Sequence, residues 1–388
     1  MAKRLLAISI LLGLLAISGC WDLREISASV IASAAGIDLA EDNKIAFSAH
    51  LIQPTAPGES GSGQSEPVTV SAIDSSVAMA ARRLMLSLSL VPEWGHVKTF
   101  LLGDRLARQD LSLCIDFMTR NRNIRPDTNL LVCVGNTPEE VLKSKLPPGA
   151  NLGAGLNDMI PESEILLGFY VPTTLEEFTY RLSTPGIEPA VPQIRLAADP
   201  ASPSNSKVRP TLYGTAVFKR NKMVGSLNEY ESRGYRWLSS GLKQGGFLTV
   251  KSPVGTEDIL GLEIINFSHQ VKPEITGNNI KMNIDIKAKL VFYEQDGTGD
   301  LLNPEIVGEI QQAANQEISR QIMACIDKSQ SLQSDILGWG ITVKNRYPAE
   351  WNHIYTEWGS IFPTVQSNVK VETLINRSNL DTRSYRFK

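Results

Sequence analysis

Residues 280–292 read IKMNIDIKAKLVF, and this stretch decides the fold of the chain. Apolar side chains occupy every second position from Ile280 to Leu290, while lysine, asparagine or aspartate stands between them. Because successive side chains of a strand point to opposite faces, the alternation predicts a strand with one buried and one solvated face. A sheet containing this strand needs a covering layer on its apolar side.

The covering layer follows directly downstream, where Asn303 and Pro304 start a predicted helix. An apolar stripe recurs every four residues along it, at Ile306, Ile310, Ala314, Ile318, Ile322 and Ile326. A second helical region from Asp335, interrupted near Pro348, is dense in aromatic side chains, and residues 368–375 read as a last strand. With strand-like stretches at 246–251 and 259–271, the pattern predicts a meandering antiparallel sheet covered by long helices, an α+β layer.

The first half of the chain predicts a second α+β region. Residues 29–38 and 44–53 read as a hairpin, and a strand at 97–102, an amphipathic helix after Asp110 and an apolar run at 129–134 form a β-α-β unit. Thr137 and Glu140 form a capping-box pattern that opens a further helix, and Asn228 with Glu231 repeats the pattern downstream.

The domain boundaries follow from composition. Residues 198–206 combine proline, serine and asparagine without an apolar period, so we place the main boundary there. The N-terminal α+β region then spans 20–200 as two subdomains, with a flexible loop at 54–67, and the C-terminal α+β domain spans 208–388, opening with a hairpin at 211–219 and 223–227. Both regions are predicted to consist of mixed sheets backed by helices.

The first twenty residues have the form of a secretory signal peptide. Lys3 and Arg4 precede an apolar run of about 13 residues, which is shorter than the roughly 20 residues that span a bilayer. The run closes with Ile17-Ser18-Gly19-Cys20, which resembles the bacterial lipobox. We therefore expect residues 1–19 to be removed and Cys20 to carry the acyl chains that hold the protein on a membrane. Ordinary signal cleavage with an incidental cysteine is the alternative.

Composition excludes several classes of protein. The chain has 388 residues, 42% hydrophobic and 20% charged, which excludes a wholly disordered chain and a polytopic membrane protein. Lys and Arg number 38 against 41 Asp and Glu, a formal charge of −3, without the basic footprint of a nucleic-acid binder. The four cysteines and four histidines are scattered along the chain, so no metal site is predicted.

The sequence lacks the motifs of common catalytic sites. It contains no Gly-x-Ser-x-Gly elbow, no P-loop and no Gly-x-Gly-x-x-Gly after a strand. Paired carboxylates such as Glu139 and Glu140 are expected on solvated helix starts. The aromatic side chains between Trp339 and Trp358 could line a ligand pocket, but their helical spacing favours core packing. We therefore predict no catalytic residue and no cofactor.

Four ordered motifs resemble the Ger(x)C lipoproteins, the C subunits of the nutrient germinant receptors of endospore-forming bacteria. The matching residues run from Cys20 to about Asn379. They are Cys20-Trp21-Asp22-x-Arg24-Glu25 with Gly36-Ile37-Asp38; Gly95-His96-Val97-Lys98 through Leu106-Ala107-Arg108 and the helix to Arg120; Gly214-Thr215-Ala216-Val217-Phe218-Lys219 with Lys222-Met223-Val224-Gly225 and Glu231-x-x-Gly234; and Tyr347-Pro348-x-x-Trp351 with Trp358-x-x-Ile361-Phe362-Pro363.

The resemblance implies a three-domain α+β protein anchored on the outer face of the spore inner membrane. It implies assembly with a multi-spanning A subunit and a transporter-like B subunit, and a scaffold role without catalysis. The family supplies no catalytic residue, so only Cys20 carries over with a defined chemical role.

Trp21, Asp22, Arg24 and Glu25 lie next to the expected lipid. We hypothesise that they contact the membrane or another subunit, although a local cap for the first strand explains them equally well. A lipid-anchored solute-binding protein and a lipid-anchored hydrolase are the alternatives from other classes. The first should show two repeated β-α lobes and the second a nucleophile or metal constellation.

Overall fold

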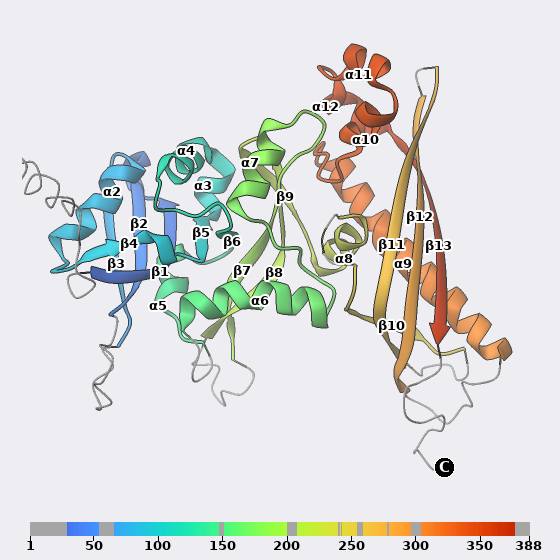
Figure 1. Ribbon diagram of the computed structural model, residues 1–388, viewed down its shortest axis with the longest axis horizontal. Coiled ribbons are helices and arrows are strands. Elements are labelled where there is room, and N and C mark those ends of the chain that lie inside the picture. The colour runs from blue at the N-terminus through green and yellow to red at the C-terminus, as the bar shows by residue number, and fades with distance from the viewer. Residues whose placement is uncertain are drawn as a thin grey trace, which may run out of the picture.

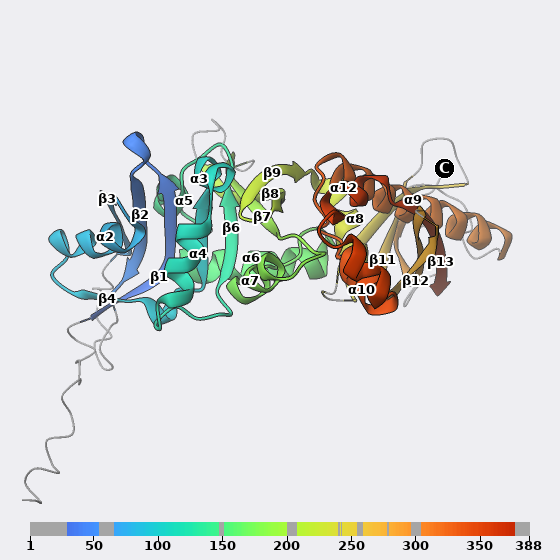
Figure 2. The same ribbon diagram turned by 90° about the horizontal axis from the view of Figure 1, so that it is seen from above.

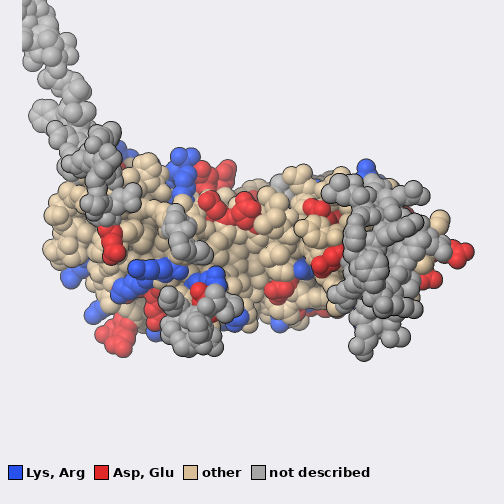
Figure 3. All heavy atoms as spheres, turned by 90° about the horizontal axis from the view of Figure 1, so that it is seen from below, with Lys and Arg blue, Asp and Glu red and all other residues tan. Residues whose placement is uncertain are grey.

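The computed structural model describes residues 29–53, 66–146, 151–199, 208–239, 241, 243–253, 259–277, 279–295 and 304–376. Two sheets follow one another along the long axis of an elongated molecule, and helices pack on both (Figures 1 and 2). The space-filling view shows the same elongated outline (Figure 3). The α+β class with mixed sheets backed by helices is confirmed.

The first sheet is mixed and has the order β3-β2-β1-β5-β6-β7-β8-β9, with β4 paired to the start of β1. Strand β1 pairs in parallel with β4 and β5, β5 with β6, and β6 with β7. The remaining pairs are antiparallel. The strands are β1 (Ser29–Leu39), β2 (Ile45–Ile52), β3 (Val68–Asp74), β4 (Val91–Glu93), β5 (Thr99–Gly103), β6 (Asn129–Cys133), β7 (Ala190–Ala198), β8 (Val208–Lys219) and β9 (Lys222–Leu227).

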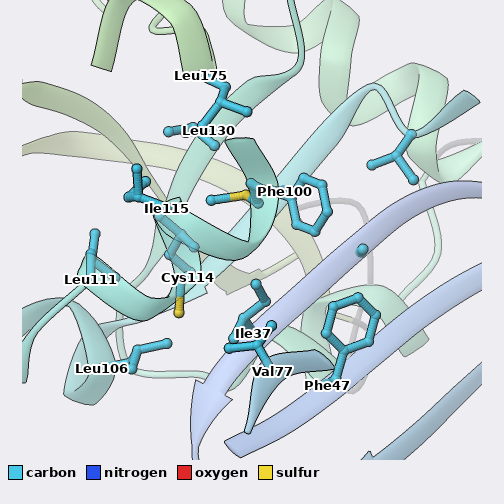
Figure 4. Close-up of a cluster of buried hydrophobic side chains, with 14 of the residues drawn as sticks. Ile37, Phe47, Val77, Phe100, Leu106, Leu111, Cys114, Ile115, Leu130 and Leu175 are labelled. Atoms are coloured by element: carbon cyan, nitrogen blue, oxygen red, sulfur yellow. The ribbon is translucent and has the colours of Figure 1, made fainter. Parts of the chain in front are cut away.

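Helices cover both faces of this sheet because its central strands are apolar on both sides. On β5, Phe100 and Leu102 belong to one core with α2, α3, α4 and α7, whereas Leu101 belongs to the opposite core with α5 and α6. Figure 4 shows Cys114 and Ile115 of α4 within the first of these cores. The helices are α2 (Val77–Arg83), α3 (Asp104–Gln109), α4 (Ser112–Arg120), α5 (Pro138–Lys143), α6 (Leu152–Leu166) and α7 (Leu175–Ser183), with 3-10 turns η2 (Glu41–Asn43), η3 (Leu84–Leu86) and η4 (Trp94–His96).

Local sequence signals place most helix starts correctly. The capping box of Thr137 and Glu140 opens α5, and that of Asn228 and Glu231 opens α8 (Glu229–Leu238), as predicted. The Ser76 side chain caps α2, which ends at Arg83 and passes into η3.

The second sheet has four strands in the order β10-β11-β12-β13. Strands β10 to β12 form the predicted antiparallel meander, but β13 lies parallel to β12, so the expectation of a wholly antiparallel sheet is corrected. The reason is the long helix α9, which returns the chain to the end at which β12 began. The bounds are β10 (Phe247–Lys251), β11 (Ile259–Thr276), β12 (Asn279–Gln295), β13 (Gln366–Asn376) and α9 (Pro304–Ser331).

Helix α9 covers one face of the second sheet with its apolar stripe. Its isoleucine and alanine side chains from Ile310 to Ile326 are buried against the even-numbered apolar positions of β12, as predicted, whereas Ile306 is only partly buried. The lysines and Asp285 of β12 lie on the opposite, solvated face. Short helices complete the layer: α10 (Trp339–Arg346), α11 (Pro348–Ile354), α12 (Trp358–Ile361) and the 3-10 turn η5 (Phe362–Thr364).

The two sheets divide after β9. Strands β7 and β8 form an antiparallel hairpin, and β8 and β9 complete the first sheet. The boundary predicted at 200–208 falls between β7 and β8, and as a boundary between domains it remains a prediction. Within the ranges that the structure describes, no helix is long and apolar enough to cross a bilayer.

The α9 stripe should dominate the stability of the second sheet. Replacing Ile318 by Ala removes a fully buried side chain and should lower the free energy of unfolding by about 2–5 kcal/mol, because the cavity cannot close completely. The exposed Gln316→Ala change on the same helix is the matched control and should leave the urea midpoint unchanged. Equal midpoints for both variants would show that the stripe is not the anchor of this layer.

Candidate functional site at the junction of the two sheets

The two halves of the molecule are joined by a packed, polar junction, and the buried carboxylate of Asp335 stands at its centre. Its Oδ1 accepts a hydrogen bond from the backbone N–H of Trp339 at 3.0 Å. Its Oδ2 accepts from the Gly340 N–H and from the Trp358 indole Nε1, both at 2.8 Å. Only 3% of Asp335 is exposed, so these donors replace the water that the carboxylate has lost.

The Asp335 carboxylate fixes the aromatic layer of the second half. It satisfies the first N–H groups of α10, which begins after Gly338 in a left-handed conformation with φ of +70°. Through the Trp358 indole it also holds α12, and the rings of Trp339, Trp351, Trp358 and Phe362 pack edge to face around it. The aromatic side chains thus form core, as the sequence predicted.

Backbone and side-chain groups of the first half bind the same segment. The Glu188 N–H donates to the Asp335 carbonyl at 2.9 Å. Arg181 of α7, which is 7% exposed, donates from Nη1 to the Ile336 carbonyl at 3.0 Å and from Nε to Glu177 at 2.6 Å. Charge-assisted bonds of this kind are stronger than neutral ones, so α7 is held firmly against the turn before α10.

Two glycines allow the halves to approach at this point. Gly186, with φ of +91°, lies against Gly340, and the N–H of Ile341 donates to the Gly186 carbonyl at 3.2 Å. A Cβ atom on Gly186 would lie 2.8 Å from both the Gly340 carbonyl carbon and the Trp351 ring. A larger residue at either glycine would therefore push the two backbones apart.

A second polar contact joins α6 of the first half to α8 and the chain before β10. Arg236 and Glu164 are each 1% exposed, and Arg236 Nε lies 3.8 Å from Glu164 Oε1. Arg236 Nη2 donates to the carbonyls of Gln244 at 2.7 Å and Gly245 at 2.9 Å. Burial lowers the pKa of Arg236, and the nearby Glu164 carboxylate opposes that shift.

Lys243 and His269 extend this second contact toward the sheet. The Lys243 Nζ lies 3.0 Å from His269 Nδ1. Burial, with the positive charge of Arg236, lowers the pKa of Lys243 to about 8, and burial with the charge of Lys243 lowers the pKa of His269 to about 4. His269 is therefore neutral at physiological pH and accepts a hydrogen bond from the lysine.

Helices α8 and α9 form the third part of the junction. Gly234 of α8 lies on α9, where a Cβ atom would overlap the Gln321 carbonyl oxygen and meet Cys325 Cβ at 2.7 Å. The Trp237 indole N–H donates to Gln321 Oε1 at 3.1 Å. The glycine of the Glu231-x-x-Gly234 motif thus permits the closest helix contact at the junction, and Glu231 caps the same helix.

The buried charged groups of the junction lie in contacts between the two halves: Arg181 with the Ile336 carbonyl, and Arg236 with Glu164. Burial raises the pKa of the Cys325 thiol on α9, and of Cys114 in a core of the first sheet, to about 12, and that of Cys133 above its usual range, so their thiolates are scarce. No group of three or more His, Cys, Asp or Glu that could hold a metal ion occurs among the residues the structure describes.

The site residues predicted from the sequence lie outside the described residues. They are Cys20, Trp21, Asp22, Arg24 and Glu25, so lipidation and the proposed contact remain predictions.

The motifs near the C-terminus meet at the Asp335 carboxylate, through Trp351, Trp358 and Phe362. The sequence did not reveal Arg181, Glu164 or Arg236 as buried, because a charged residue on a helix usually marks a solvated face. A charged residue that interrupts the apolar stripe of a helix is the sequence signal that could have indicated their burial.

Two family models match this chain in order. The model described as spore germination protein N-terminal domain matches residues 22–196, and the one described as spore germination B3/GerAC like, C-terminal matches residues 213–379. The chain belongs to the Ger(x)C family of spore germination proteins. The residues between the two matches, 197–212, comprise the end of β7, the β7–β8 connection and the first part of β8.

Relatives of the Ger(x)C chain cover nearly its whole length. It is 23% identical over 395 residues to spore germination protein KC of Bacillus subtilis, covering 97% of this chain and 96% of that one. It is also 23% identical to spore germination protein B3 of the same organism, over 90% and 91% of the two chains. The crystal structure of the GerBC protein superimposes with a TM-score of 0.59 at 16% identity, over 91% of this chain and 99% of the other, which shows a shared fold.

The Asp335 carboxylate gives the junction a pH dependence. Burial raises its pKa from 3.8 to about 6, so the folded chain holds this proton more tightly than the unfolded chain does. The contribution of Asp335 to stability is therefore largest at acid pH, falls as pH rises from about 4 to about 6, and is constant above. We expect Asp335→Asn to remove that slope from urea midpoints measured between pH 4 and 8.

The matched control for this prediction is Asp327→Asn, which changes an exposed aspartate of α9. It should keep the pH dependence of the parent chain. A parent and an Asp335→Asn variant with parallel profiles would show that the carboxylate does not titrate in this range.

Proposed function

We propose that this chain is a non-catalytic, lipid-anchored C subunit of a nutrient germinant receptor. Membership of the Ger(x)C family gives the chain a role in spore germination. The finer proposal is that it acts as a scaffold, held on the outer face of the spore inner membrane through Cys20 and assembled with a multi-spanning A subunit and a transporter-like B subunit. No catalytic residue, metal or cofactor is part of this proposal.

The observation that carries the proposal is the ordered match of both family models over nearly the whole chain. The buried charges of Arg181, Glu164 and Arg236 also make contacts between the two halves of the chain. A scaffold must keep distant surfaces in a fixed relation. The Asp335 carboxylate, the Gly186–Gly340 approach and the α8–α9 contact supply that rigidity between the two sheets.

A lipid-anchored solute-binding protein is the alternative that the same chain could satisfy. Titration calorimetry of the chain with amino acids and sugars separates the two functions. A scaffold should give no saturable heat, whereas a solute-binding protein should give a stoichiometric isotherm. Turnover of a spore substrate by the purified chain would contradict the scaffold proposal.

The lipid anchor has a direct test. Replacing Cys20 by Ala should abolish incorporation of labelled palmitate and release the chain from the membrane fraction, because the sulfur that carries the acyl chains is lost. The buried Cys325→Ala change is the matched control and should still be labelled. A Cys20→Ala chain that keeps both the label and the membrane would show that the lipobox interpretation is wrong.

The subunit contact is tested in spores that carry a single receptor. Arg24→Glu should reduce recovery of the A and B subunits in cross-linked pull-downs and slow nutrient germination, if Arg24 lies at the contact. Arg346→Glu reverses the charge of an exposed arginine on α10 and is the matched control. Normal assembly and germination with Arg24→Glu would place the contact elsewhere on the chain.

A further inference from the structure

Exposed apolar side chains gather at the outer end of the first sheet. Of the twenty large hydrophobic side chains that are exposed in the described part of the chain, six lie within residues 68–91. Such a concentration marks an interaction surface more often than scattered exposed residues do. We call the exposed apolar side chains of η3 and the start of β4, Met85, Leu86 and Val91, the apolar edge. Ile73 is not part of it, because the pairing of Ile73 with Ala46 and of Ala46 with Asp38 places it near the end of β1, far from the Ser29–Val91 pair.

The apolar edge lies on the segment of residues 84–91, which runs from η3 to the start of β4. Leu84 is fully buried, and Leu88 and Leu90 pack partly buried against the core of the first sheet. Leu86, by contrast, is 83% exposed although it lies two residues from the Leu84 anchor. The segment is therefore fixed to the core at several points while Leu86 points outward.

The segment lies beside the start of the first strand. Val91 of β4 pairs in parallel register with Ser29, the first described residue of β1. Cys20 is nine residues earlier in the sequence, and an extended chain of that length reaches about 30 Å at most. This step rests on the proposed function, since it takes Cys20 as the lipid-bearing residue. A bilayer holding that lipid then lies within reach of the apolar edge.

The charges around the segment favour a negatively charged lipid surface. Arg82 and Arg83 end α2 directly before η3, and Arg82 is exposed, while Arg83 is paired with Asp74. Lys98, just beyond β4 and η4, is also exposed. Basic side chains beside apolar ones are typical of surfaces that bind anionic lipids.

We propose that the apolar edge rests on an anionic bilayer, with Leu86 inserted into its interfacial layer, as a second membrane contact beside the lipid anchor. The apolar edge fixes the orientation of the first sheet on the membrane, which a flexible tether alone does not do. The second sheet, at the other end of the elongated molecule, then extends away from this contact (Figure 2).

Leu113 provides a matched control on the same domain. It is 70% exposed on α4, which follows the carboxyl ends of the parallel strands, whereas Val91 and Ser29 lie at their amino end. Leu86→Cys and Leu113→Cys introduce reactive thiols, because Cys114, Cys133 and Cys325 are buried. Both variants can be labelled with an environment-sensitive fluorophore in the mature chain.

The experiment places each labelled chain on vesicles of phosphatidylglycerol and phosphatidylcholine that contain a spin-labelled quencher lipid. One preparation is the acylated chain. In the other preparation a histidine tag replaces residues 1–20 and binds a nickel-chelating lipid. This chain is therefore tethered to the vesicle without Cys20. The probe at residue 86 should shift to the blue and be quenched at least several-fold more than the probe at residue 113.

Binding strength gives the second readout. Leu86→Asp should weaken vesicle binding of the untethered chain by roughly tenfold, whereas Leu113→Asp should leave it unchanged. Equal quenching of the two probes on tethered vesicles would overturn the proposal. Shielding of residue 86 only after the A and B subunits are added would also overturn it, by assigning the apolar edge to a protein contact. Failure of the lipid anchor is a separate outcome, because the preparation expected to be acylated at Cys20 would then contain no palmitate.

Discussion

The rest of the molecule depends on the buried carboxylate of Asp335. A carboxylate without water is costly, and here three donors from two helices replace that water. The same turn receives Arg181 and Glu188 from the first half of the chain. One buried carboxyl group therefore orders the aromatic layer, the start of α10 and the docking of α7 together. Replacing the whole group by an apolar side chain would leave several donors unsatisfied, which costs more than the loss of one hydrogen bond.

Much of the fold could be predicted from the sequence because the relevant physics is local. The alternation at 280–292 and the four-residue stripe of α9 reflect burial of one face, and both capping boxes reflect backbone groups within one turn. The direction of β13 could not be predicted, because an apolar alternation is the same for a parallel and an antiparallel neighbour. Proline-rich composition marked a connection near residue 200, but it could not show that the strands on either side of it, β7 and β8, pair in one sheet.

The candidate site was harder to predict than the fold. Arg181 and Arg236 are charged residues on helices, and the sequence alone assigns such residues to a solvated face. Their burial results from contacts between segments far apart in the chain, Arg181 with Ile336 and Arg236 with Glu164. The need for glycine at positions 186, 234 and 340 likewise depends on which backbone segments lie against them in the fold. The residues next to Cys20 lie outside the described ranges, so their roles rest on the sequence.

The parallel strand β13 has a consequence for how the protein is made. It pairs with β12 along residues 366–376, which follow α9 and are synthesised after the other three strands of this sheet. Until they arrive, one edge of β12 offers unpaired backbone groups to any other strand. The second sheet therefore cannot be completed before β13 has been synthesised. A chain truncated after α9 would leave the edge of β12 unpaired along its length. We therefore expect chaperones to bind such truncated chains and proteases to degrade them.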